Sequence, residues 1–176
     1  MVKQSIVLAA IVIGALSVIA IGSGIIPIQI NDENKILEIE QQVHYYTNLE
    51  REKHGLLPLS YNNELSTIAK LHSKDMLQRD FFGHADPSGC EADCRYQRFN
   101  YSCDSPTGVI AGENLHWWQY SDNIFWQSAE QIGRETVSSW MESPSHRENI
   151  LSPLYRNEGI GVVITLQESF ITQNFC

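Results

Sequence analysis

Positive charge is scarce in this sequence, and that scarcity excludes one large class of partners. The chain has 12 Lys and Arg residues against 21 Asp and Glu residues, and its formal charge at pH 7 is −9. Its Lys and Arg residues form no basic stripe, and nucleic-acid binding depends on such clusters to neutralise phosphates. We therefore expect no nucleic-acid partner. Internal repeats and low-complexity linkers are also absent.

Charge of either sign is missing from residues 5–30, which are almost entirely apolar or small. A bilayer span needs about 20 apolar residues. A cleavable signal has a shorter apolar region of roughly 7 to 15 residues before small residues, a role that Ala20 to Gly22 could fill. Residues 1–30 are thus predicted to be either a retained membrane anchor or a signal peptide. The positive charge of Lys3 precedes the span, so residues 31–176 should lie outside the cell as one domain.

Close cysteine pairs of the kind that hold structural zinc are also missing. Cys90 and Cys94 form one close pair, but Cys103 and Cys176 do not form a second, so an all-cysteine zinc site is a poor match. An even count in an exported protein favours disulfides for all four. Because Cys94 and Cys103 bracket one short segment, we predict that they pair and leave Cys90 to Cys176.

Hydrophobic spacing predicts two helices in the first half of the domain. In residues 33–54 the apolar positions recur at the spacing of one helical face, and Gly55 is a natural stop. A second helix should begin after Asn62 or Asn63 as its N-cap and carry His72 on its apolar side. A lone His there is more often a hydrogen-bonded core residue than a ligand.

The remaining segments predict a mixed fold. A short helix is expected at 91–99, in a region rich in Cys, Gly and Pro. Another is expected at 128–142, where Pro144 interrupts it. Two β-branched runs, 160–166 and 169–175, indicate an antiparallel hairpin. Helices first and strands last indicate an α+β sandwich with helices packed on an antiparallel sheet.

Four segments in this order resemble one known family. They read "TNLEREKHGLLPLSYNNELSTIAKLHSKDMLQRDFFGHADPSG", "GENLHWW", "VSSWMESPSHRENILSPLYRNEGIGVVIT" and "FITQNFC". This combination is similar to the CAP superfamily of cysteine-rich secretory, antigen 5 and pathogenesis-related proteins, in its compact prokaryotic SCP-like form. The resemblance covers residues 36–176. It implies a three-layer α-β-α sandwich with a central antiparallel sheet and a cleft on one side.

The resemblance also implies a set of cleft residues. The family's cleft is lined by two histidines and acidic residues, which correspond to His84 in "FFGH", Glu113 in "GEN" and His146 in "SPSHRENIL". On this interpretation the break at Pro144 lets His146 leave the helical course and face the other two. Larger relatives have a further glutamate, but Glu142 is one residue short of that position, a rotation of about 100° on a helix.

Two imidazoles and one carboxylate suit two kinds of chemistry. His84, Glu113 and His146 match the ligand set of an open zinc site, so Zn²⁺ is the expected cofactor if a metal binds. The same trio could instead act as a general acid-base set. A structural alternative remains, in which the ring of His146 bonds to a backbone carbonyl and Glu113 caps a helix or loop. The sequence has no HExxH motif and no obvious Ser or Cys nucleophile.

An aromatic segment follows Glu113. Its rings suit core and rim packing, or they line a groove for a lipid, glycan or wall polymer. Its members are His116, Trp117, Trp118, Tyr120, Phe125 and Trp126. His44 and His54 occupy solvent-facing positions of the first helix and receive no role.

Two functions follow from these observations. The first is a cell-surface or secreted binding module for a small-molecule, lipid, glycan or envelope-polymer ligand. The second is a metal-assisted or acid-base hydrolase of peptides or envelope polymers. Fold analogy does not decide between them, and the sequence names neither the ligand nor the oligomeric state.

Overall fold

The computed structural model describes residues 32–103 and 111–176. The predicted anchor or signal peptide, residues 1–30, lies outside the described residues. Within those two ranges, no helix is both long enough and apolar enough to span a bilayer. The helices are α1 (Glu33–Lys53), α2 (Asn63–Arg79), α3 (Ala92–Arg98), η1 (Ile124–Trp126), α4 (Ala129–Glu142) and α5 (Pro144–Ile150). The strands are β1 (Ser60–Tyr61), β2 (Gly112–Gln119), β3 (Asn157–Ile164) and β4 (Glu168–Phe175).

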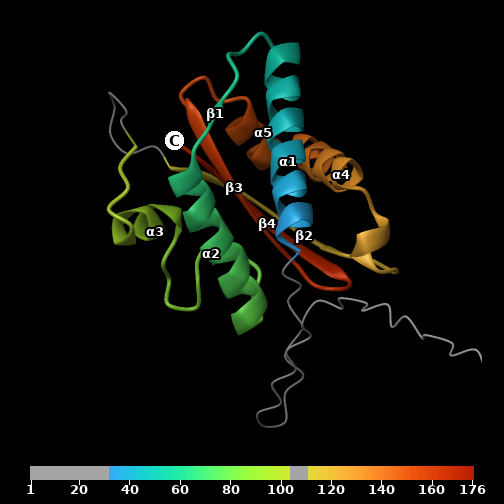
Figure 1. The fold of residues 1–176 in the computed structure, drawn as a ribbon. Coiled ribbons are helices and arrows are strands. Elements are labelled where there is room, and N and C mark those ends of the chain that lie inside the picture. Colours follow the sequence, from blue (N-terminus) through green and yellow to red (C-terminus); the bar gives the residue numbers. More distant parts are fainter. Residues whose placement is uncertain (1–31, 104–110) are drawn as a thin grey trace, which may run out of the picture.

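The sheet has the order β1-β3-β4-β2 (Figure 1). Strands β3 and β4 form the predicted antiparallel hairpin, with Ile164 opposite Ser169 next to the turn. Strand β2 pairs antiparallel with β4 and forms one edge. The two-residue β1 joins β3 in parallel at the other edge. The expected antiparallel sheet is therefore confirmed, apart from this short parallel addition.

Helices cover both faces of the sheet (Figure 1). On one face, Ile160 and Val162 of β3 share a core with Ile39 of α1 and Trp140 of α4. On the other face, residues of β3 and β4 pack against α2; they are Val163 and Phe170, in contact with Met76 and Leu77. Alternate residues of one strand thus enter different cores, which gives the three-layer α-β-α sandwich.

Two glycines allow α2 to lie close to β3. A Cβ atom on Gly161 would come within 1.9 Å of the Lys70 backbone nitrogen, and one on Gly159 within 2.1 Å of that of Ser66. Those separations are far below van der Waals contact, so any side chain here would push α2 off the sheet.

The predicted helices in the first half are confirmed. The apolar face of α1 is buried, and Gly55 follows the helix with φ +70°. The Asn62 side chain caps α2 by accepting from the backbone N–H groups of Glu64 and Leu65. Such a cap is worth about 1 kcal/mol.

The predicted effect of Pro144 is corrected by the structure. Ser143 ends α4 and also caps α5, and Pro144 is the first residue of the new helix. Proline is favoured there because its missing N–H group would have had no helical partner. His146 therefore lies in the first turn of a second helix rather than outside the helical course.

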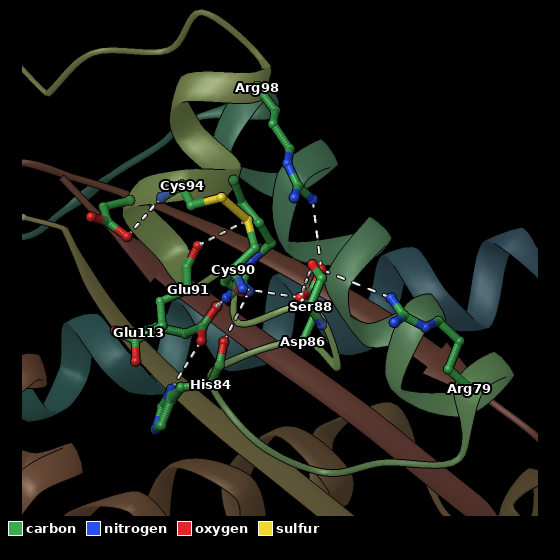
Figure 2. The surroundings of a disulfide bond; sticks show 11 residues. Arg79, His84, Asp86, Ser88, Cys90, Glu91, Cys94, Arg98 and Glu113 are labelled. Atoms are coloured by element: carbon green, nitrogen blue, oxygen red, sulfur yellow. Dashed lines mark hydrogen bonds and ion pairs between the residues drawn. A yellow bond between two sulfur atoms is a disulfide. The ribbon is translucent and has the colours of Figure 1, made fainter.

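The predicted disulfide pairing is wrong, although all four cysteines are oxidised. The bonds join Cys90 to Cys94 and Cys103 to Cys176, with Cα–Cα distances of 5.4 Å and 5.3 Å. Cys90 precedes α3 and Cys94 lies in its first turn, so the start of the helix brings them together (Figure 2). The rest of α3 separates Cys94 from Cys103, which instead meets the residue after β4.

Candidate functional site

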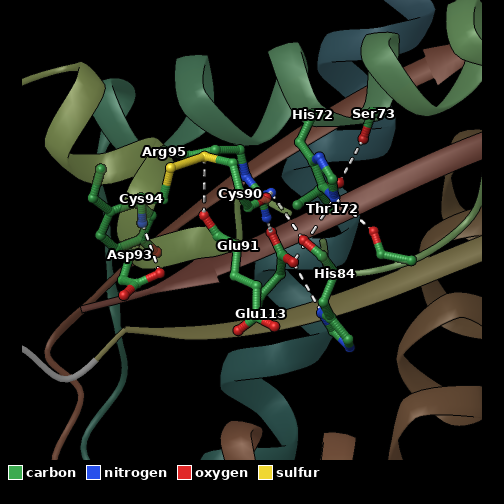
Figure 3. A network of polar contacts seen from close by, with 12 residues as sticks. His72, Ser73, His84, Cys90, Glu91, Asp93, Cys94, Arg95, Glu113 and Thr172 are labelled. Carbon is green, nitrogen blue, oxygen red and sulfur yellow. Dashed lines mark hydrogen bonds and ion pairs between the residues drawn. A yellow bond between two sulfur atoms is a disulfide. The ribbon is translucent and has the colours of Figure 1, made fainter. Parts of the chain in front are cut away.

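Two of the three predicted cleft residues contact each other directly. Glu113 is buried on β2, and His84 lies in the loop after α2 with a side chain that is 51% exposed. The Nδ1 atom of His84 donates to Glu113 Oε1 at 2.9 Å (Figure 3). A carboxylate on Nδ1 leaves Nε2 as the ring nitrogen that can meet solvent or a ligand.

Arg95, which the sequence did not single out, holds this pair in place. Its side chain is buried, and Nη2 donates to Glu113 Oε2 at 2.5 Å. Its Nη1 donates at 2.9 Å to the backbone carbonyls of His84 and of Cys90. One guanidinium therefore fixes the carboxylate, the loop with the histidine and the start of α3. We call His84, Glu113 and Arg95 the His84–Glu113 site.

The loop between His84 and α3 has its own internal order. Asp86 Oδ1 accepts from the backbone N–H groups of Ser88 and Cys90 at 2.8 Å and 3.0 Å (Figure 2). Hydrogen bonds from Ser88 and Cys90 hold the pKa of Asp86 far below its usual range. Its other oxygen lies 3.8 Å from Arg79 and 3.6 Å from Arg98. The loop is thus a hydrogen-bonded turn, closed by the disulfide.

His72 is a core histidine, as its position on the apolar side of α2 predicts. Its side chain is fully buried, and Nε2 donates to the Gly83 carbonyl at 3.0 Å. The same nitrogen lies 3.9 Å from Glu113 Oε1. Burial lowers the pKa of His72, and the charge of Glu113 opposes that effect. The residue supports the site from within the core.

His146 approaches the site but is not hydrogen bonded to it. Burial lowers the pKa of His146, and the nearby charge of His84 lowers it further. Burial and then the charge of His146 lower the pKa of His116 to about 4. His146 therefore lies within electrostatic reach of both His84 and His116. Glu142 is exposed at the end of α4, and no described residue forms an ion pair with it.

The His84 ring is poised for hydrogen bonding. The bond with Glu113 raises the pKa of His84, against the effect of burial. A neutral ring would offer Nε2 as an acceptor or a base, and a protonated ring would offer it as a charged donor. Glu113 caps no helix, and it is already bound on both oxygens. Its chemical part is to orient His84.

This arrangement does not fit a zinc ion. Among residues 32–103 and 111–176, no group of three or more His, Cys, Asp and Glu side chains is placed to hold a metal. Both Glu113 oxygens are taken, by Arg95 and by His84, and a metal ion here would face the guanidinium charge. Zinc binding by His84, Glu113 and His146 stays a prediction that would require Arg95 to move.

The structure has a cavity of about 340 Å³ beside the site, between α2 and α3. Arg95 and His72 line it, together with Arg79, Arg98 and Asp86. His84, Glu113 and His146 do not. The predicted cleft residues therefore lie outside this cavity.

Two exposed aromatic rings lie on the elements that carry the site: Phe82 is two residues before His84, and Trp117 is four residues after Glu113 on β2. Phe82 and Trp117 are 52% and 42% exposed, with ring centroids 6.4 Å apart. On the other face of β2, Trp118 is exposed and stacks on His116. The rest of the aromatic segment divides between two roles: Tyr120 and Phe125 pack on the core, whereas Trp126 is 78% exposed.

Comparison with known proteins agrees with this fold. The sequence model of the Cysteine-rich secretory protein family (CAP) matches residues 44–175. The chain is 32% identical over 124 residues to "Uncharacterized protein YkwD" of Bacillus subtilis (strain 168), covering 70% of this chain and 42% of that protein. It is 29% identical over 136 residues to "Uncharacterized membrane protein YlbC" of the same strain, covering 77% and 34%. The chain thus spans less than half of either relative.

Two solved structures resemble this one. One is an extracellular protein containing a SCP domain from Bacillus anthracis str. Ames, with a TM-score of 0.64 and 26% identity, covering 83% of this chain and 43% of that one. The other is an outer surface protein from Borrelia burgdorferi, with a TM-score of 0.65 and 16% identity, covering 85% and 97%; at that identity it shows the fold alone. From the family match over residues 44–175, this chain belongs to the cysteine-rich secretory protein (CAP) family.

Proposed function

We propose that this chain is an extracellular CAP protein whose His84–Glu113 site binds a component of the cell envelope, a glycan or a lipid with polar groups. Residues 1–30 would export the domain, residues 31–176, and anchor it or be removed. Support for the location comes from the apolar charge-free segment and from similar proteins described as extracellular or outer surface proteins.

The observation that carries the proposal is the half-exposed His84 ring, held by a buried carboxylate next to exposed aromatic rings. Glu113 fixes the Nδ1 side of the ring at 2.9 Å, which aims Nε2 away from the core. Phe82 and Trp117 supply exposed rings on the same side. A fixed polar atom beside apolar rings is the usual composition of a ligand site, because the rings give contact area and the polar atom gives orientation.

Binding explains the arrangement better than catalysis does. A general base needs a free lone pair close to the substrate; both Glu113 oxygens are already engaged by Arg95 and His84, so Glu113 is not that base and only His84 is left for the role. Holding a histidine in one tautomer serves a hydrogen bond to a ligand without any further group. His84 would accept from a hydroxyl when neutral and donate to an anionic oxygen when protonated.

A binding assay tests this function. The purified chain is titrated with soluble peptidoglycan fragments and, separately, with phosphatidylglycerol vesicles. His84→Ala should weaken binding of the ligand by about tenfold, the equivalent of about 1.4 kcal/mol for one charge-assisted hydrogen bond. Trp117→Ala should weaken it similarly. Tyr45→Ala, which removes an exposed ring from α1, is the control. Equal affinity of all three variants would contradict the proposal.

The second candidate function is an acid-base hydrolase, favoured by one observation. The His84 and Glu113 pair has the orientation that lets a carboxylate support an imidazole base. Turnover of peptides or envelope polymers, measured with and without Zn²⁺ for the parent chain and for His146→Ala, distinguishes the hydrolase from the binding module. Turnover that depends on the histidines selects the enzyme. Saturable binding without turnover selects the binding module.

The location is tested separately by protease accessibility. Protease added to intact cells should digest the unfolded domain while a cytoplasmic marker survives, because the charge-free segment, residues 5–30, directs the domain outward. A domain that stays protected together with the marker would contradict export.

A further inference from the structure

A hydrogen bond between a partly exposed histidine and a buried carboxylate lies on the opposite side of the sheet from His84. His44 of α1 has a side chain that is 29% exposed, and its Nδ1 donates to Glu158 Oε1 at 2.6 Å. Glu158 lies on β3 and is completely buried. This hydrogen bond thus joins a partly exposed histidine to a carboxylate inside the core.

A chain of amides begins at this carboxylate. Gln173 of β4 uses both hydrogens of its side-chain amide, one to Glu158 Oε2 at 2.5 Å and one to Thr47 Oγ1 at 2.9 Å. Its oxygen accepts from Asn114 Nδ2 at 3.2 Å. Asn114 lies directly opposite Gln173 across the sheet, so the two side chains share the face toward α1.

The chain ends at the backbones of two residues of the predicted cleft. Asn114 Nδ2 also donates to the His146 carbonyl at 3.2 Å. Asn149 Nδ2 donates to Asn114 Oδ1 at 2.9 Å and to the Glu113 carbonyl at 3.2 Å. The amides therefore fasten the first turn of α5 and the start of β2 to the centre of the sheet.

The carboxylate gives this chain one direction. An ionised carboxylate only accepts hydrogen bonds, so the NH₂ group of Gln173 must face Glu158. Its oxygen must then face the NH₂ group of Asn114, whose oxygen in turn faces Asn149. Turning any one amide would place donor against donor, or acceptor against acceptor, at its contacts with its neighbours. Such a network is strong when every member is satisfied and fails when one is not.

We propose that Asn114 and Gln173 are positioning residues for the His84–Glu113 site, and that the hydrogen-bonded pair of His44 and Glu158 sets the orientation of their amides. This inference rests on the proposed function of that site. Because burial raises the pKa of Glu158 and the hydrogen bond from His44 opposes that rise, Glu158 without His44 would take up a proton and could donate to the Gln173 oxygen. The amides would then be free to turn, and the backbones of Glu113 and His146 would lose their fixed donors. A change at His44 on α1 would thereby alter the positions of the Glu113 and His146 backbones at the site on the far side of the sheet.

Other charged groups also face the buried carboxylate. Burial raises the pKa of Glu158, and the hydrogen bond from His44, the amide of Gln173 and the charge of Arg51 oppose that rise. Tyr61 of β1 is near enough that the charge of Glu158 contributes to its raised pKa. Arg51 donates only to backbone carbonyls, so the direct contacts of Glu158 are the His44 ring and the Gln173 amide.

Nuclear magnetic resonance on the full chain in detergent micelles tests the proposal without any ligand. The variant is His44→Phe, and the matched control is His54→Phe, because His54 ends α1 and its ring bonds only to the Glu50 carbonyl. In His44→Phe the side-chain amide signals of Asn114 and Asn149 should shift well beyond their change in the control. The carbonyl carbon signals of Glu113 and His146 should shift with them.

Two further results keep the test decisive. The indole N–H signal of Trp140, which donates to the Leu115 carbonyl in the core, reports whether a variant is folded. If His44→Phe unfolds, Glu158→Gln replaces it, and its new NH₂ group should disturb the same Asn114 and Asn149 signals. Shifts that stop at Gln173 would overturn the proposal. Failure of envelope fragments to bind would count against the proposed function alone.

Discussion

Replacing Arg95 with Met tests how the site is held together. Met has a similar length but no charge, so Glu113, which is only 7% exposed, loses the guanidinium 2.5 Å from its Oε2. Removing one partner of a buried ion pair costs about 3 to 5 kcal/mol, because the other charge stays buried. The His84 and Cys90 carbonyls also lose their donor, at about 1 kcal/mol each. We expect a total loss of about 5 kcal/mol or more.

The assay is urea unfolding at neutral pH, with the free energy of unfolding extrapolated to water. Adding Glu113→Gln to Arg95→Met should recover about 2 kcal/mol, because the buried group is then uncharged. Arg98→Met is the control, since Arg98 is 57% exposed and lies 3.6 Å from Asp86; such pairs contribute at most about 1 kcal/mol. If Arg95→Met costs no more than Arg98→Met, the central position given to Arg95 is wrong.

Three other predictions concern stability, pH and metal. Replacing Cys103 and Cys176 with Ser should lower the free energy of unfolding by about 4 kcal/mol, and replacing Cys90 and Cys94 by about 2 kcal/mol. The difference arises because the first disulfide joins residues 73 positions apart and the second residues 4 positions apart. Urea unfolding that gives the reverse order would contradict this. His116→Phe should be more stabilising at pH 5 than at pH 8 by about 2 kcal/mol, because His116 takes up a proton near pH 6.5 when unfolded but only near pH 4 when folded. The parent chain therefore loses stability as the pH falls from 6.5 toward 4, and the variant lacks this loss. Calorimetry that finds the same pH dependence for parent and variant would refute the assignment. Zinc affinity, measured by calorimetric titration, should rise in Arg95→Met and be lost in His84→Ala. In every variant it should also be lost below about pH 5.5, where the imidazoles are protonated. A zinc affinity that His84→Ala does not change would exclude the predicted metal site.

Local patterns were enough to predict the hairpin and the helices α1, α2, α3 and α4, but not α5. Helix α2 shows why: its cap, its apolar spacing and the core position of His72 all lie within one short segment. Strand β2 was missed because its first half, Gly112 to Leu115, is buried and its end is exposed. It therefore lacks the alternation by which an amphipathic strand is found.

Non-local contacts were beyond the reach of the sequence. Arg95 is an isolated cation in a cysteine-rich segment, and its acceptors lie on three different parts of the chain. The disulfide prediction failed for a related reason: spacing along the chain says nothing of how α3 turns Cys94 away from Cys103. His84 and Glu113 were found only through family resemblance, because they are 29 positions apart and form no local motif.

The central claim is that His84, oriented by Glu113, contacts a ligand beside Phe82 and Trp117. The most direct test is a titration of the ¹⁵N-labelled chain with soluble peptidoglycan fragments, followed through the imidazole and indole nitrogen signals. We predict that His84 Nε2 and the indole N–H of Trp117 shift along one saturation curve, while the ring nitrogens of His54 stay unchanged. Saturable binding that moves neither His84 nor Trp117 would contradict the claim.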